Sequence, residues 1–145
     1  TLRAIWIERE TSDFSAFREA IEYLNRGWIV GISPEGTRST TGVLLAGKPG
    51  AALLVRKTGL PVLPAAVSGT ADMGKQLSHF RKMEILVKFG EPYQIPLTQD
   101  EEEAKDWLNK ATDEIMCRIA ALLPPERRGV YADHPRLKEL LNSFV

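Results

Sequence analysis

The sequence has little cysteine, no excess of charge and no long apolar run, and each shortage excludes a class of protein. A single cysteine, Cys117, excludes an internal disulfide framework, and its helical, apolar setting predicts a core thiol. The 19 basic residues balance 19 acidic residues, which argues against a nucleic-acid partner held by overall positive charge. No apolar run approaches the roughly 20 residues that span a bilayer, and the first residues of the sequence do not have the pattern of a signal peptide. A soluble or peripheral chain is expected, and its start in strand-like sequence is typical of a cut chain.

The order of apolar runs predicts an α/β fold in a single domain, 1–145. A short run with Ile and Trp at 3–7 is typical of a strand. Apolar residues then recur every three or four positions up to Gly27, which indicates a helix that this glycine ends. A second strand is expected at 28–32. Strand, helix and strand in this order favour a parallel pair with a helical crossover.

The remainder of the chain is expected to alternate between helix and strand and then to become helical. A short buried helix is predicted at 49–58, and further strands at 60–67 and 84–89. A capping-box pattern and an apolar stripe predict one long helix at 99–123, with a short helix around 136–141. The fold class is therefore α/β, with a mixed, mostly parallel sheet flanked by helices.

The loop at 31–39 concentrates groups that bind phosphate. It follows a predicted strand, and open α/β sheets bind ligands in the crevice at the carboxyl ends of their strands. Gly36 lets backbone amides approach an anion, Thr37 adds a hydroxyl, and Arg38 offers a planar fork that matches two phosphate oxygens. Glu35 is expected to pair with an arginine and to orient it. From composition alone, a plain surface turn with an ion pair is an equally good interpretation.

A resemblance to a known family decides between these two interpretations. Residues 33–39 are similar to the phenylalanine-proline-glutamate-glycine-threonine-arginine-serine motif of the glycerolipid acyltransferases, the lysophosphatidic acid acyltransferase family, with Ser33 as the one departure. Further blocks that resemble the family follow its order at 7–9, 48–51, 60–65 and 89–92. The resemblance implies a glycerolphosphate-acyltransferase-like fold without its N-terminal elements, the C-terminal part of a catalytic domain. Residues 1–92 are its motif-bearing core and 93–145 its variable helical tail.

The family's activity and site are carried over on the matching residues. The resemblance implies transfer of a fatty acyl group from acyl-CoA or acyl carrier protein to the hydroxyl of a lysophospholipid or glycerol phosphate, in phospholipid biosynthesis. The acyl thioester is a substrate, and neither a cofactor nor a metal is implied. Arg9 and Arg38 would clamp the acceptor's phosphate with help from Gly36 and Thr37, and Glu35 would support the site. Glu8 stands where the family usually has aspartate.

The apolar block at 60–65 is the second candidate region. The resemblance makes Pro61, Val62, Leu63 and Pro64 candidates for an acyl or acceptor pocket. An ordinary buried strand explains their apolar character at least as well.

The sequence lacks the base that acyl transfer needs. A group must take the proton of the attacking hydroxyl, and the family uses a histidine and an aspartate, spaced histidine-x-x-x-x-aspartate, upstream of the Arg9 block. Only eight residues precede Arg9, and none is histidine. His79 and His134 have Glu84 and Glu139 five positions on, but both lie downstream of the loop and are interpreted as exposed loop histidines. We therefore expect no acyl transfer by this chain alone.

Two lipid hypotheses stay open. One is an enzyme of phospholipid synthesis that works peripherally at the cytoplasmic side of the membrane, with contact from its absent part or from a basic patch at Lys75, Arg81, Lys82 and Lys88. The alternative is a non-catalytic module that binds a phospholipid or acyl-CoA. A general anion-binding domain explains the loop but not the ordered blocks. Absent N-terminal elements should also uncover a sheet edge or an apolar helix-binding face, which favours self-association.

Overall fold

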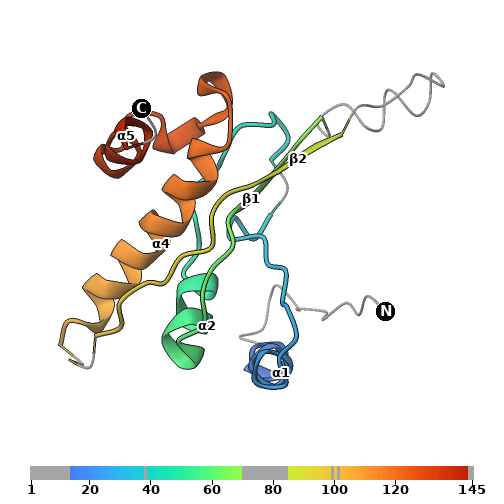
Figure 1. The fold of residues 1–145 in the computed structure, drawn as a ribbon, viewed down its shortest axis with the longest axis vertical. Helices are drawn as coiled ribbons and strands as arrows, with labels where there is room; N and C mark the ends of the chain where they lie inside the picture. Colours follow the sequence, from blue (N-terminus) through green and yellow to red (C-terminus); the bar gives the residue numbers. More distant parts are fainter. Residues whose placement is uncertain (1–13, 38, 70–84, 99, 101, 144–145) are drawn as a thin grey trace.

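The computed structural model describes residues 14–37, 39–69, 85–98, 100 and 102–143. Helices α1, α2, α4 and α5 and strands β1 and β2 appear in these ranges, with two short 3-10 turns (Figure 1). Their bounds are α1 Phe14–Asn25, α2 Gly50–Thr58, β1 Ala65–Ser68, β2 Leu86–Phe89, α4 Ala104–Ala121, η1 Pro125–Arg127, η2 Gly129–Tyr131 and α5 Pro135–Asn142. No helix in the described ranges is both long enough and apolar enough to cross a bilayer.

The expected α/β class is confirmed, and the described sheet is a two-stranded antiparallel ribbon. Ala65 of β1 lies opposite Phe89 of β2, and an isolated bridge between Val62 and Tyr93 continues the pairing beyond the strands. The mostly parallel arrangement is not seen in the described part. Its first expected strand, 3–7, lies outside that part, and 28–32 has no strand ladder within it, because residues with strand propensity still need a pairing partner.

The predicted helices are confirmed except for the start of the longest one. Gly27 follows α1 with a φ of 80°, and Gly59 closes α2 in the left-handed conformation. The long helix begins at Ala104 rather than at 99. The backbone amide of Asp100 donates to the Thr98 hydroxyl, and the Asp100 carboxylate accepts from the next described amide, at Glu102. These side chains hold the backbone in turns that compete with helix.

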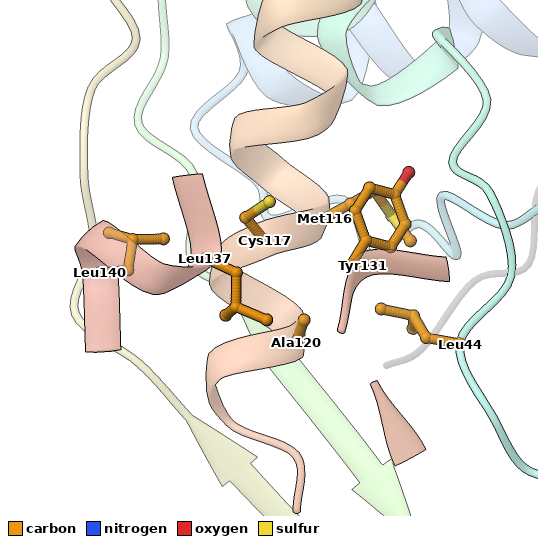
Figure 2. Close-up of a cluster of buried hydrophobic side chains, with 7 residues drawn as sticks. All are labelled: Leu44, Met116, Cys117, Ala120, Tyr131, Leu137 and Leu140. Carbon is orange, nitrogen blue, oxygen red and sulfur yellow. The ribbon is translucent and has the colours of Figure 1, made fainter. Parts of the chain in front are cut away.

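The core is assembled around α4, which packs against α5, α2 and β1 (Figure 1). One cluster of buried side chains joins α4 to α5, η2 and a distant loop, as Figure 2 shows: Leu44, Met116, Cys117, Ala120, Tyr131, Leu137 and Leu140. A second cluster joins α4 to α2 through Ala51, Ala52, Ala111 and Ile115. The largest fully buried side chains, Met116, Leu137 and Cys117, all come from the expected helical tail.

One face of the ribbon is open, and the opposite face is covered only at Ala66, because Leu86 and Lys88 on that face are exposed. Successive side chains of a strand alternate between faces, and opposite residues share a face. Ala66 is 6% exposed and contributes to the core, whereas its neighbour Val67 is 54% exposed. Val87, opposite Val67, and Phe89 are 46% and 65% exposed. The open face is therefore apolar.

Candidate functional site

A tight turn forms the first half of the candidate phosphate loop. The amide of Gly36 donates to the carbonyl of Ser33 at 3.1 Å, and Pro34 occupies the second position, which proline favours in such turns. Gly36 has a φ of 66°, a left-handed conformation that glycine adopts without steric cost. Gly36 and Thr37 are exposed, so the turn presents backbone and a hydroxyl to solvent. Arg38 lies outside the described residues.

Lys48 lies across this turn. A β-carbon built on Gly36 would be 2.8 Å from Cδ and 3.2 Å from Nζ of Lys48. The Lys48 amide also donates to the carbonyl of Pro34 at 2.7 Å, so the backbone of Lys48 is held on the loop and its side chain lies over the turn. The sequence assigned no role to Lys48 beyond its place in a family block. A basic residue in a block that follows a phosphate loop was the signal that could have revealed it.

Glu35 anchors the loop by a backbone contact. Its Oε2 accepts a hydrogen bond of 2.7 Å from the amide of Leu45, and the residue is half-buried. The sequence predicted instead that Glu35 pairs with an arginine. Arg9 and Arg38 lie outside the described residues, so that pairing stays a prediction. The observed contact gives Glu35 a structural role in the described part of the loop.

Residues 44–48, which we call the strap, connect the loop to the C-terminal helices. On the helical side, the Leu44 amide donates to the Arg127 carbonyl at 3.0 Å. The Gly47 amide donates to the Tyr131 hydroxyl at 2.9 Å. There is no space for a side chain at Gly47, because a β-carbon there would lie 2.5 Å from Cγ of Met116. The strap is therefore held between the loop and α4.

The four candidate pocket residues at 61–64 do not share a surface. Val62 and Pro64 point inward, where Val62 packs against the α2–α4 cluster and Pro64 is buried. Pro61 and Leu63 are exposed. Two surface cavities of about 370 and 380 Å³ lie elsewhere, the first beside α4 and the second between the ribbon and the residues that follow α4, and none of the four residues lines either. Their assignment to a pocket stays a prediction.

His134 is a helix cap rather than an exposed loop histidine. It is the N-cap of α5, and its Nδ1 accepts from the Arg136 amide at 3.2 Å. Its side chain is only 29% exposed, and Nε2 lies 3.7 Å from Asp113. Pro135 explains this position, since it starts α5 and leaves the preceding residue extended. Glu139 is paired with Arg136 and not with His134.

The remaining candidates fall mostly outside the described residues. His79, Glu84 and the first three members of the basic patch lie there. Lys88, the fourth member, is exposed on β2. In the described ranges, no group of three or more His, Cys, Asp or Glu side chains is placed to hold a metal ion.

Comparison with known proteins shows that the chain is similar to acyltransferases. Residues 1–68 match the family model described as Acyltransferase. The chain is 36% identical over 91 residues to the 1-acyl-sn-glycerol-3-phosphate acyltransferase of Bacillus subtilis (strain 168), a match that covers 63% of this chain and 43% of that protein.

A solved relative is the 1-acyl-sn-glycerophosphate (LPA) acyltransferase PlsC from Thermotoga maritima, at 30% identity and a TM-score of 0.48. That match covers 70% of this chain and 44% of the other. The chain thus spans less than half the length of the relatives it matches.

Proposed function

We propose that the loop and Lys48 form the phosphate-binding part of an acyltransferase site that takes a lysophospholipid or glycerol phosphate as acceptor. The observation that carries the proposal is the position of the Lys48 ammonium against Gly36, inside the segment that matches the family's signature. The exposed Thr37 adds a hydroxyl beside it. Arg9 and Arg38 complete the proposed clamp, since a guanidinium binds two phosphate oxygens at once.

In this proposal the phosphate contacts orient the acceptor for acyl transfer. The acceptor hydroxyl attacks the thioester carbonyl, its proton passes to a base, and the thiolate leaves as the ester forms. Fixing the remote phosphate reduces the entropy that the attack would otherwise lose. The histidine-x-x-x-x-aspartate block does not occur in the sequence, and the ring of His134 is engaged in capping. We propose that turnover requires residues outside this chain.

The donor and the location follow from the same proposal. Acyl-CoA or acyl carrier protein supplies the thioester, and no separate cofactor takes part. A lysophospholipid acceptor resides in a bilayer, which places the whole enzyme peripherally at the cytoplasmic side of the membrane, in phospholipid biosynthesis.

A comparison of two lipids tests the acceptor assignment. We expect a short-chain lysophosphatidate below its micelle concentration to bind at least about tenfold more tightly than the monoacylglycerol with the same chain, because the charge-assisted contacts need the phosphate. NMR titration should shift the amides of Gly36 and Thr37 only with the phosphate-bearing lipid. Equal affinities would refute the phosphate site.

A turnover assay separates the enzyme from a pure binding module. With acyl-CoA and lysophosphatidate, we expect no product from the chain alone and restored turnover when an upstream histidine-x-x-x-x-aspartate segment is joined to it. Activity of the chain alone that His134→Ala abolishes would overturn the assignment of the base. Binding without turnover in the joined protein would favour the non-catalytic module.

A further inference from the structure

We propose that Tyr131, in the C-terminal helical region, is a positioning residue for the phosphate loop and acts through the strap. This inference rests on the proposed function of the loop. Tyr131 lies 83 or more positions from every residue of the strap, and no family block includes it. Its role can therefore be inferred only from the contacts that the fold creates.

The Tyr131 side chain is buried, and the packing of its ring places its hydroxyl beside the strap. Only 5% of the residue is exposed, and its ring belongs to the cluster with Met116 and Leu44. Figure 2 shows the ring between these two side chains, with its hydroxyl at the edge of the cluster. That hydroxyl accepts a hydrogen bond of 2.9 Å from the Gly47 amide. Among the described residues, this is the one side-chain hydrogen bond from the helical region to the strap.

Backbone amides of the strap bond to partners on two opposite sides. The amides of Leu44 and Gly47 bond to the helical region, through Arg127 and Tyr131. The amides of Leu45 and Lys48 bond to the loop, through Glu35 and Pro34. A displacement of the strap at Gly47 therefore also displaces the next residue, which is bonded to the loop.

That next residue is Lys48, whose ammonium carries the proposed phosphate contact. The strap cannot move toward α4, because Gly47 is already in contact with Met116. Loss of the Tyr131 bond leaves movement away from α4 as the free direction. Such movement displaces both the Lys48 ammonium and the amide that anchors Glu35, so the loop loses its charge and its anchor together.

Tyr131→Phe tests the inference, because it removes one hydroxyl and leaves the ring packing in place. The matched control is Tyr93→Phe, since the buried Tyr93 hydroxyl has no hydrogen-bond partner among the described residues. The probe is glycerol 3-phosphate, titrated calorimetrically into each form of the 145-residue chain. We expect affinity to fall about threefold to tenfold in Tyr131→Phe and to stay unchanged in Tyr93→Phe.

Amide hydrogen exchange separates positioning from general destabilisation. In Tyr131→Phe, exchange at Leu45 and Lys48 should accelerate at least about fivefold, while the α4 amides around Cys117 keep their rates. Uniform acceleration, including α4, would mean that Tyr131 only stabilises the fold. Unchanged affinity together with unchanged exchange at Leu45 would also overturn the inference.

A measurement on the unaltered chain gives an independent test. Binding and positioning are reciprocal, so saturating glycerol 3-phosphate should slow exchange of the Gly47 amide. If the ligand binds and leaves Gly47 exchange unchanged, Tyr131 is not coupled to the site. If the unaltered chain does not bind the ligand, the proposed function fails, and the connection from Tyr131 to the loop is then judged by Leu45 and Lys48 exchange in the variant alone.

Discussion

Gly36 and Lys48 form a pair in which the absence of one side chain makes room for another. The left-handed backbone favours glycine at position 36, and a β-carbon there would force the flexible Lys48 side chain to shift. The lysine thereby brings a positive charge to the loop. In the described part of the loop, Glu35 is the one charged residue, and its charge is negative. At the scale of single residues, the charge at the loop depends on two residues that are twelve positions apart in the sequence.

Lys48→Met is predicted to weaken phosphate binding without unfolding the chain. Methionine keeps most of the apolar stem over Gly36 and removes the charge, so glycerol 3-phosphate affinity should fall about tenfold. Lys57→Met is the matched control, because it removes the same charge from an exposed position in the last turn of α2. Calorimetric titration measures both. A similar loss in the two variants would indicate a general charge effect in place of a contact.

Cys117 behaves as the predicted core thiol. It is fully buried, and burial, followed by the negative Asp113 and Glu114, raises the pKa of its thiol to about 11. The neutral thiol is therefore the form present at physiological pH, which leaves Cys117 without the thiolate that a nucleophile needs.

At the scale of elements, the C-terminal helices determine where the loop lies. The strap passes along α4 and η2, and its partners on that side come from the C-terminal part of the chain. The closest approach is at Gly129, where a β-carbon would lie 1.9 Å from the carbonyl oxygen of Leu44. The proposed phosphate loop and the elements that position it are thus separate in sequence.

Gly129→Ala should destabilise the fold far more than Gly27→Ala. Both glycines have positive φ, 53° and 80°, so both substitutions incur about 1–2 kcal/mol of left-handed strain. Only Gly129 would also press a methyl group into backbone, which raises its cost to about 3 kcal/mol or more. Nothing lies within 4 Å of a β-carbon at Gly27. Urea unfolding of both variants checks the difference, and equal losses would contradict the packing of the strap against η2.

An ion-pair network joins α4 to α5 and should be sensitive to acid. Burial opposes the ionisation of Glu114, but hydrogen bonds from Arg136 and Arg118 outweigh it and lower its pKa below the ordinary 4.5. Because the folded chain holds the proton less tightly, the network stabilises the fold above pH 4.5 and loses that stabilisation as the pH falls further. The glutamate therefore fastens α5 at neutral pH.

Glu114→Gln is predicted to lower the free energy of unfolding by about 1–3 kcal/mol at pH 7 and to flatten its fall below pH 4.5. Asp106→Asn provides the control, since its pair with Lys110 is exposed and worth little. Urea titrations at several pH values measure both variants. A wild-type pH dependence retained in Glu114→Gln would contradict this account.

At the scale of the whole molecule, the described residues leave a large apolar surface uncovered. The open face of the ribbon includes Val67, Val87 and Phe89, and Ile29 in the extended run after α1 is 93% exposed. An exposed apolar sheet face such as that of the ribbon is typical of a surface that another element or chain covers.

We expect the chain to self-associate through this face. Phe89→Ser should lower the weight-average mass in sedimentation at high protein concentration, because it removes a large apolar side chain from the open face. Val130→Ser is the control, since Val130 is 64% exposed, close to the 65% of Phe89, but lies on η2. A monomer at all concentrations, or equal effects of the two variants, would contradict self-association through the ribbon.

Much of the fold could be predicted from sequence because local signals are strong there. Gly27 and Gly59 end helices through their own conformational freedom, and β2 follows from alternating apolar residues. The start of α4 could not, because side chains such as Thr98 and Asp100 compete with the helix for backbone amides. The antiparallel pairing of the ribbon could not be predicted from the sequence either, because strand partners are selected by long-range packing.

The sequence by itself determined the resemblance to acyltransferases and the chemical character of the loop, because motif residues and their spacing are local properties. Only the tertiary structure brought Lys48 against Gly36, placed the Tyr131 hydroxyl on the strap and engaged His134 in capping α5. These contacts depend on where separate elements meet. That is decided by burial of apolar side chains around α4, which no motif records.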